Sequence, residues 1–317
     1  MSWNRILQND SGPNELPRRR IDAMFAQQRD TWPALRDGEA ALDHLQRKTL
    51  TLDDQAVIVQ VNPARRRSTH ATTDAQAIAA RPCFLCPDNM PVEERGVAFE
   101  ELVVLPNPYP ILPLHCTIAH RDHRPQQLVG HVDTFLRLAA AIGPDMAALY
   151  NGPRCGASAP DHFHFQAARA SDIPILSQLP PHAGKRTVFV HLSFGRNMLV
   201  FRSSVAEHVQ TEIERTLKQL CRLDATDDEP MFNLLANYSA DQYTAIFFPR
   251  AAHRPAQYFA TGAEHLAISP AVLEMAGILV TTEPEHFARI DTSTARSIYE
   301  QVSIAPNRFR ELVDLVG

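Results

Sequence analysis

The residues best suited to chemistry lie in the stretch "ASAPDHFHFQAA", residues 157–168. His162, His164 and Gln166 stand at every second position, with a phenylalanine between each pair. Side chains two residues apart share one face of an extended strand, so the polar groups would line one side while the phenylalanines anchor the other in the core. A strand that merely turns a polar face to solvent is the alternative. The small-residue loop directly before the strand favours a functional face.

These residue types suit phosphorus chemistry. A neutral imidazole is a good nucleophile near pH 7 and forms a reactive phosphoramidate with a phosphoryl group. The attacked group gathers negative charge, which calls for donors that need no reorganisation. Gln166 and the backbone amides of the loop "RCGASA" could supply them, because glycine and small residues let the chain approach a phosphate closely.

A second constellation is the pair Cys83 and Cys86 in "RPCFLCPDN", which has the short spacing of a zinc site. Two thiolates need two further ligands, and a redox dithiol or a pair of plain core cysteines are the alternatives. If the pair binds zinc, His162 would be a ligand and His164 the nucleophile. The histidines that could complete the site are His115, His120, His123 and His162.

Basic residues near these segments could clamp phosphates, although each could equally be a solvated surface group. A tight basic turn, formed by Arg250, His253 and Arg254, could reach a substrate, cap a helix or pair with acids. The other arginines considered are Arg65, Arg66, Arg67 and Arg154.

Composition places the chain among ordinary globular proteins. Its 317 residues allow two domains, and 44% apolar residues with a net charge of −5 make a nucleic-acid-binding surface unlikely. The apolar runs are too short to span a membrane, and the N-terminus "MSWNRILQND" has no apolar signal region. We therefore expect a cytoplasmic protein with reduced thiols.

Apolar periodicity predicts an α+β fold. Two strands, 101–105 and 115–119, precede an amphipathic helix over 126–142 and two more strands, 145–150 and 162–168. Because strand follows strand on each side of one helix, neighbouring strands are expected to be antiparallel. The other expected elements are helices within 17–47, a strand over 54–61, strands near 187–193 and 197–202, a helix at 204–222, strands at 231–237 and 242–248, and helices towards the C-terminal end.

A short internal echo indicates duplication. His-Arg-Pro occurs at 123–125 and again at 253–255, each time after an apolar strand and a turn that contains an arginine. Because this context repeats as well, a diverged duplication is expected. The second copy lacks His-x-His-x-Gln. We predict a catalytic half with the N-terminal helices over residues 1–185 and a degenerate second half over residues 186–317.

The segment "GASAPDHFHFQA" resembles the active-site strand of the galactose-1-phosphate uridylyltransferase branch of the histidine triad superfamily. Its variant, His-x-His-Phe-Gln-Ala, is similar to that of the plant and animal GDP-L-galactose phosphorylases. "RPCFLCPDN", "HCTIAHRDHRPQ" and "VQVNPARRRS" resemble the zinc cysteines, the hairpin with a zinc histidine and the N-terminal substrate strand of the same branch. "NPARRRSTHATTDAQAIAARPCFLC" and "FFPRAAHRPAQYF" look like a bacterial family of unassigned function.

The resemblance implies roles for individual residues. His164 would be the nucleophile that becomes nucleotidylated, and Gln166 the donor to its phosphate. His123 is preferred to His115 as the third zinc ligand, because it follows the strand where the family's ligand stands. The implied ligands of a structural zinc ion are Cys83, Cys86, His123 and His162. The substrate-binding residues are predicted to be Asn151, Arg154, Gly156, Ser158, Arg65 and Arg66.

The resemblance also implies a duplicated, histidine triad-like antiparallel sheet with flanking helices. The implied activity is ping-pong transfer of a nucleoside monophosphate from an NDP-sugar or dinucleoside polyphosphate, through His164, to phosphate or a sugar phosphate. Histidine triad hydrolases have a third histidine in place of Gln166. A hydrolase is therefore one alternative, and a non-catalytic, zinc-stabilised nucleotide-binding protein is another. A homodimer is the expected assembly, without nucleic acid or membrane partners.

Overall fold

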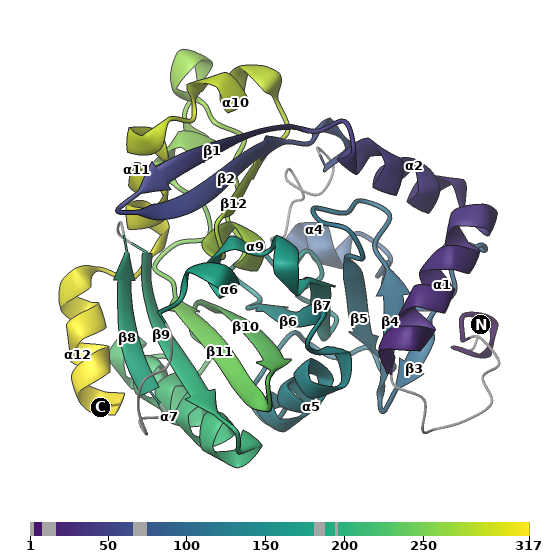
Figure 1. The fold of residues 1–317 in the computed structure, drawn as a ribbon, viewed down its shortest axis with the longest axis horizontal. Helices are drawn as coiled ribbons and strands as arrows, with labels where there is room; N and C mark the ends of the chain where they lie inside the picture. Colours follow the sequence, from purple (N-terminus) through teal and green to yellow (C-terminus); the bar gives the residue numbers. More distant parts are fainter. Residues whose placement is uncertain (1–2, 8–16, 66–74, 181–187, 194–195, 317) are drawn as a thin grey trace.

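The centre of the molecule is a nine-stranded antiparallel sheet, seen in a computed structural model that describes residues 3–7, 17–65, 75–180, 188–193 and 196–316 (Figure 1). The strand order is β3-β4-β5-β7-β6-β10-β11-β9-β8. Its strands are β3 (Val97–Phe99), β4 (Leu102–Pro106), β5 (Cys116–His120), β6 (Met146–Asn151), β7 (His164–Arg169), β8 (Val188–Ser193), β9 (Arg196–Ser203), β10 (Phe232–Ser239) and β11 (Gln242–Pro249).

The sheet is a duplicated unit. In the first half β4 and β5 precede helix α5 (Val132–Ile142), which β6 and β7 follow. In the second half β8 and β9 precede helix α7 (Ala206–Asp224), which β10 and β11 follow. The two halves have the same strand order, 4-5-7-6 and 8-9-11-10, and they join edge to edge where β6 pairs with β10. The predicted α+β class and the duplication are confirmed. The boundary at residues 185 and 186 stays a prediction.

The repeated His-Arg-Pro motif, which suggested the duplication, does not occupy equivalent positions in the two halves. His-Arg-Pro at 123–125 follows β5, whereas His-Arg-Pro at 253–255 follows β11. In the repeated unit the counterpart of β5 is β9, and β11 is the counterpart of β7. A three-residue match carries too little information to set the register of a repeat, so the inference was right and its reason was wrong.

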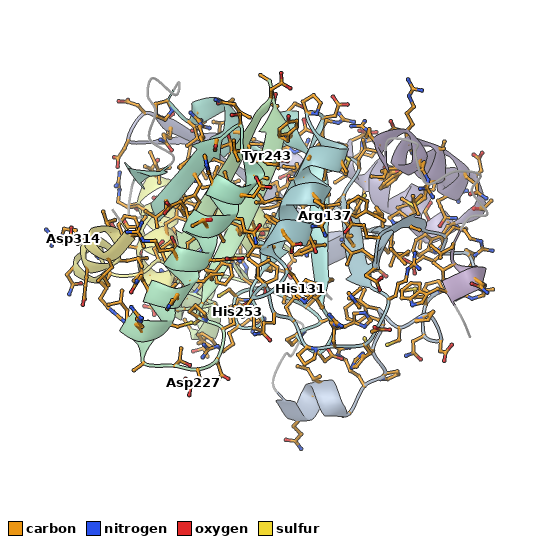
Figure 2. All side chains as sticks on the ribbon, turned by 90° about the horizontal axis from the view of Figure 1, so that it is seen from below. His131, Arg137, Asp227, Tyr243, His253 and Asp314 are labelled. Carbon is orange, nitrogen blue, oxygen red and sulfur yellow. The ribbon has the colours of Figure 1, made fainter. Side chains whose placement is uncertain are left out.

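Both faces of the sheet are apolar and covered. Helices α5 and α7 lie side by side across one face, with Arg137 on the outer surface of α5, paired with Glu100 and Asp133 (Figure 2). The N-terminal helices α1 and α2 and the C-terminal helix α12 extend this layer. A turn in which Gly130 has φ +82 precedes α5, so the helix predicted from residue 126 begins only at Val132. The helices of this layer are α1 (Pro17–Thr31), α2 (Pro33–Leu42), α5 (Val132–Ile142), α7 (Ala206–Asp224) and α12 (Pro306–Val316).

The other face carries a small second sheet of order β1-β2-β12. Its third strand comes from the C-terminal half and pairs parallel with β2, so the two halves of the chain interlock. The first strand, β1, begins at Gln46, where we expected a helix to continue to residue 47. This layer contains β1 (Gln46–Leu52), β2 (Gln55–Val61), β12 (Ile278–Thr281), α6 (Pro174–Gln178), α9 (Val272–Met275), α10 (Pro284–Arg289) and α11 (Thr292–Val302).

The remaining helices are short and lie in connections. Among the described residues no helix is long and apolar enough to cross a membrane. The connecting segments are α4 (Ala75–Ala79), α8 (Ala256–Phe259) and the 3-10 turns Trp3–Arg5, Pro63–Arg65, Ala170–Asp172 and Gly262–Glu264.

Candidate active site

Strand β7 divides its side chains as the alternation predicts. Phe163, just before it, and Phe165 are fully buried in the core under the helical layer, where their rings meet edge to face with centroids 4.9 Å apart. His164 and Gln166 point to the opposite face and line a cavity of about 780 Å³. The polar face of the strand therefore opens on this cavity.

The orientation of His164 leaves one ring nitrogen for chemistry. Its Nδ1 lies 2.7 Å from the carbonyl oxygen of His162, which can only accept, so Nδ1 carries the proton and donates. Nε2 then keeps its lone pair, and no described residue hydrogen-bonds to it. Burial lowers the pKa of His164 to about 4, so the ring is neutral near pH 7. This is the state in which an imidazole acts as a nucleophile.

Gln126 holds the backbone at this point. Its amide nitrogen donates to the carbonyl oxygens of Asn151 at 2.8 Å and His164 at 3.0 Å, and its amide oxygen accepts from the His164 N–H at 2.8 Å. The backbone pairing of β6 and β7 ends at Leu149 and Gln166. Beyond this pair, the buried Gln126 side chain takes the place of the next backbone hydrogen bonds between the two strands. Gln126 was not among the predicted site residues, because a glutamine in a loop carries no local signal of burial.

His115 is part of the site, but as a neighbour of Gln166. Its Nδ1 accepts from the Ile111 N–H at 3.1 Å, so Nε2 carries the proton and donates to Gln166 Oε1 at 2.9 Å. This bond fixes the amide of Gln166 with its oxygen towards His115 and its NH₂ group away from it. Burial and the nearby Arg65 lower the pKa of His115 to about 4, which keeps the ring neutral and the arrangement intact.

The small-residue loop reaches the cavity through three of its predicted residues. Asn151, Gly156 and Ser158 line the cavity. Gly156 has φ +102, and a Cβ there would come within 2.5 Å of the Ala271 side chain, so only glycine allows this close approach. The predicted Arg154 does not line the cavity; its guanidinium donates to the carbonyl oxygen of Glu229 at 3.0 Å.

Asn151 is oriented from the second half of the chain. Its side-chain oxygen accepts from Asn233 Nδ2 and from the Val272 N–H, both at 2.8 Å. Arg250 in turn donates to the Asn233 oxygen and to several carbonyl oxygens, among them that of Pro270 at 3.0 Å. Arg250 is therefore a structural residue, and Asn151 keeps its NH₂ group for the cavity.

The second half also builds one wall of the cavity. His253, Arg254 and Ser269 line it, and the Ser269 hydroxyl lies 3.0 Å from Arg254 Nε and 3.1 Å from His253 Nε2. Glu274 lies in the same wall and accepts from the Ala271 N–H at 2.9 Å. Of the basic turn, His253 and Arg254 line the cavity and Arg250 does not. Ser269 and Glu274 had no motif that could have revealed them.

The arginines of the N-terminal half differ in whether they line the cavity. Arg65 lines the cavity and donates to the carbonyl oxygen of Tyr109. Arg66 lies outside the described residues. Arg81, which we had not selected, also lines the cavity and pairs with Asp161 at 3.0 Å, so it ties the cysteine segment to the loop before β7.

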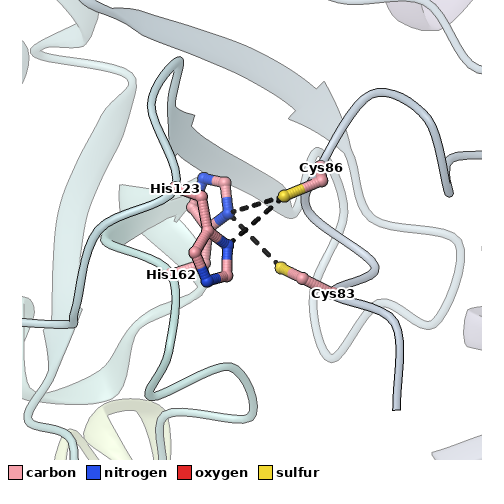
Figure 3. A group of neighbouring side chains, drawn as sticks. All are labelled: Cys83, Cys86, His123 and His162. Atoms are coloured by element: carbon pink, nitrogen blue, oxygen red, sulfur yellow. Dashed lines mark hydrogen bonds between the residues drawn. The ribbon is translucent and has the colours of Figure 1, made fainter. Parts of the chain in front are cut away.

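The four predicted zinc ligands come together beside the cavity (Figure 3). Their candidate ligand atoms all lie within 4.8 Å of one another. Cys83 Sγ is 3.3 Å from His162 Nδ1, and Cys86 Sγ is 3.3 Å from His123 Nδ1. Sulfur and nitrogen ligands at the corners of a zinc tetrahedron lie about 3.5 Å apart. The group can hold a metal ion, and it contains His123 and not His115.

This cluster is connected to His164, the predicted nucleophile, through the backbone of His162. His162 Nε2 lies 2.8 Å from the carbonyl oxygen of His120, an arrangement that orients Nδ1 towards the cysteines. The carbonyl of the same His162 accepts from His164 Nδ1. Fixing His162 on a metal would therefore also fix the ring of His164.

Comparison with protein families divides the chain in two. Residues 24–169 match a family described as a domain of unknown function, DUF4922. Residues 171–317 match the GDPGP1-like C-terminal domain. No curated protein matches the chain in sequence.

Among solved structures, the chain is similar to yeast Ap4A phosphorylase Apa2, with 15% identity and a TM-score of 0.62 over 92% of this chain and 98% of that chain. The complex of that enzyme with Ap4A matches at 16% identity and a TM-score of 0.58, over 91% and 97% of the two chains. An ADP-glucose phosphorylase from Arabidopsis thaliana overlaps at 15% identity, over 82% and 100%, but only at a TM-score of 0.36. The duplicated sheet and the match to Apa2 over most of both chains show that this chain has the same duplicated fold as that enzyme, and its C-terminal half matches the GDPGP1-like domain in sequence.

Proposed function

We propose that this protein is a nucleotidyltransferase that moves a nucleoside monophosphate through a covalent bond to His164. The observation that carries the proposal is the hydrogen bond from His164 Nδ1 to the His162 carbonyl oxygen. Because this bond uses the proton of the neutral ring, Nε2 keeps its lone pair in the cavity that Gln166 also lines. A histidine that served only to bind a nucleotide would need no such arrangement.

In the first step, His164 Nε2 attacks the α-phosphorus of the nucleotide donor. The N–P bond forms as the bridging P–O bond breaks, and that oxygen leaves with its electron pair on the sugar phosphate or the remaining polyphosphate. Charge gathers on the non-bridging oxygens, towards which Gln166 and Asn151 can turn their NH₂ groups. Donors that are already in place stabilise this charge without reorganisation.

In the second step an acceptor takes the nucleotide. A phosphate oxygen attacks the phosphorus, the N–P bond breaks, and its electron pair returns to Nε2. The wall that contains His253 and Arg254 supports an anionic acceptor, phosphate or a sugar phosphate, rather than water alone. Gln166 supports the same choice, because the hydrolases of the superfamily have a histidine at its position.

The donor belongs to the class of NDP-sugars and dinucleoside polyphosphates. A solved structure with a similar duplicated fold is that of an Ap4A phosphorylase, determined with Ap4A bound. The C-terminal half matches the GDPGP1-like C-terminal domain. A cavity of about 780 Å³ that both halves of the chain line suits a ligand of this size.

Zinc would be held by Cys83, Cys86, His123 and His162, a donor set typical of structural zinc sites. Such an ion would stabilise the segment before β3, the loop after β5 and the residues just before β7. With four protein ligands the site leaves no open position for substrate, so its contribution is to the position of His164.

Labelling tests the proposal directly. The protein is incubated with α-³²P-labelled nucleotides and NDP-sugars, and the labelled protein is then treated with acid and with base. We expect label that is acid-labile and base-stable, as a phosphoramidate is. The label should be absent from His164→Gln and present in His208→Gln, a matched change at an exposed histidine on α7. No label from any donor in the wild-type protein would refute covalent transfer and favour a binding protein.

A chase separates the enzyme classes. Labelled protein is mixed with phosphate, with sugar phosphates or with buffer alone. Release of a nucleoside diphosphate or NDP-sugar identifies a transferase, whereas equally fast release of the monophosphate in buffer alone identifies a hydrolase.

A further inference from the structure

Glu94 is a buried acid that faces the cavity and has no hydrogen-bonded partner for its carboxyl group among the described residues. Its exposed fraction is 8%, and it lines the same cavity as His164 and Gln166. The positive charge of Arg5 lowers the pKa of Glu94. The Arg5 guanidinium, however, donates its hydrogen bonds to backbone carbonyl oxygens, including those of Pro87 and Pro91, both at 3.0 Å. A buried carboxyl group without a partner costs stability, which calls for a reason to keep it.

The backbone around Glu94 is held rigidly. The fully buried Gln28 of α1 donates from its amide nitrogen to the Glu93 carbonyl at 3.0 Å and accepts on its amide oxygen from the Arg95 N–H at 2.8 Å. The Glu94 N–H itself donates to the Pro91 carbonyl at 3.2 Å. Gln28 and Arg5 thus fix the segment on both sides of Glu94, as a site that recognises a ligand group requires.

The sheet register shows how the cavity runs from Gln166 towards β4. Gln166 stands opposite Thr117, and Thr117 stands opposite Leu105, so the three form a row across β7, β5 and β4. Neighbouring strands are about 4.8 Å apart, which makes the row roughly 10 Å long. A Cβ at Gly96 would lie 2.8 Å from Leu105 Cδ2, so the segment just after Glu94 packs against the far end of this row, and Glu94 lines the same cavity as Leu105. A nucleotide whose α-phosphate lies at the Gln166 end of the row would have its base on the side of β4.

The surface between the two ends suits a flat aromatic ring. Leu85 and Leu105 line the cavity and pack together in one apolar cluster. The exposed aromatic rings of Phe84 and Tyr109 stand at the same cavity. Apolar walls with one polar group at the edge are what a nucleobase needs.

We propose that Glu94 selects guanine, by accepting the N1–H and the 2-amino group of the base on its two carboxylate oxygens. The proposal rests on the proposed function and adds the identity of the base. Guanine is the base whose pairing edge offers two adjacent donors. Adenine and cytosine offer a donor beside an acceptor, and uracil offers one donor between two carbonyl oxygens, so each would place a lone pair against a carboxylate oxygen.

The electrostatics of the pocket agree with a ligand that brings donors. Burial raises the pKa of Glu94 to about 8, and the charge of Arg5 opposes this rise only in part. Two N–H donors would supply the hydrogen bonds that an ionised carboxyl group lacks in the pocket, and bonds of this charge-assisted, bidentate kind are the strong ones.

Binding of nucleoside monophosphates tests the proposal without any catalytic step. The affinities of the wild-type protein for GMP, IMP and AMP are measured by calorimetry. IMP is identical to GMP except that it lacks the 2-amino group. We expect GMP to bind about tenfold or more tightly than IMP, and IMP more tightly than AMP, because each lost charge-assisted bond costs about tenfold. Binding of AMP as tight as that of GMP would overturn the proposal, and so would equal binding of GMP and IMP.

Two variants complete the test. Glu94→Gln replaces one acceptor with a donor and is expected to reduce the GMP over AMP preference at least about tenfold. Glu93→Gln, at the exposed neighbour, should leave the preference unchanged. An unchanged preference in Glu94→Gln would overturn the proposal. If that variant fails to fold, the wild-type ranking of GMP, IMP and AMP still decides.

The proposed function fails separately. Selective GMP binding without covalent label would refute nucleotidyl transfer and leave the role of Glu94 intact. Equal labelling from GDP- and ADP-linked donors, with equal GMP and AMP binding, would refute the role of Glu94 and leave nucleotidyl transfer intact.

Discussion

Replacing His115 by phenylalanine tests whether this histidine works through Gln166. The ring is 1% exposed and makes two hydrogen bonds, from the Ile111 N–H at 3.1 Å and to Gln166 Oε1 at 2.9 Å. Phenylalanine keeps the ring and removes both. Each net hydrogen bond contributes about 1 kcal/mol, and a buried group left without its partner costs about 1–3 kcal/mol. We expect the free energy of unfolding to fall by about 2–4 kcal/mol.

The effect on chemistry follows from the amide of Gln166. Without the donor of His115, the amide can rotate and present its oxygen to the phosphate, where the developing charge repels it. Loss of one hydrogen bond of about 1 kcal/mol makes this rotation about fivefold easier, and full loss of one preorganised donor slows a reaction about 10²- to 10³-fold. The labelling rate of His115→Phe should therefore fall between about fivefold and 10²-fold, and Gln166→Ala should fall further.

A double-mutant cycle on the single-turnover labelling rate decides between coupled and independent roles. In the Gln166→Ala background, His115→Phe should have no further effect, because its action passes through the missing amide. Effects that multiply would refute the reasoning, as would wild-type labelling in His115→Phe. The control is His131→Phe on the opposite face of the sheet, where the ring packs on Phe163 with centroids 4.6 Å apart. Urea denaturation establishes that each variant is folded during the assay.

Three further predictions concern the metal, the strand junction and pH. Cys86→Ser should abolish stoichiometric zinc in mass spectrometric metal analysis, whereas Cys221→Ser on α7 should retain it; zinc retained by the first variant would contradict the assignment. Gln126→Ala removes three hydrogen bonds and should lower the free energy of unfolding by about 3–4 kcal/mol in urea denaturation, against about 0.5 kcal/mol or less for the exposed Gln127→Ala. Burial lowers the pKa of His115 to about 4, so the unfolded chain takes up a proton there between about pH 6.5 and pH 4 that the folded chain does not. The contribution of neutral His115 to the free energy of unfolding is complete above pH 6.5 and is lost as the pH falls from about 6.5 to about 4. Over this range the free energy of unfolding of His115→Phe should fall by up to about 3 kcal/mol less than that of the wild type. Equal falls would contradict a neutral, buried His115.

Local patterns in the sequence determined much of the fold and the chemistry. Alternation at residues 162–166 predicted which side chains enter the core, because a strand reverses its side-chain direction at every residue. The short spacing of Cys83 and Cys86 predicted two ligands on one turn. Strand pairs on each side of a helix predicted the antiparallel sheet. All of these depend on residues close together in the chain.

The tertiary structure decided what those residues meet. It brings His123 to the cysteines and His115 to Gln166, a difference that no spacing could show because both histidines flank the same strand. It turns Arg154 away from the cavity.

It also brings to the site residues that no motif marks. The Gln126 side chain lies between β6 and β7, and Glu94 and Glu274 line the same cavity although they are far apart in the chain. Contacts of this kind form between segments up to about half the chain apart, so they depend on how the sheet halves and the second layer pack. The sequence by itself therefore indicated a type of chemistry, and the packing of distant segments decided which side chains surround the predicted site.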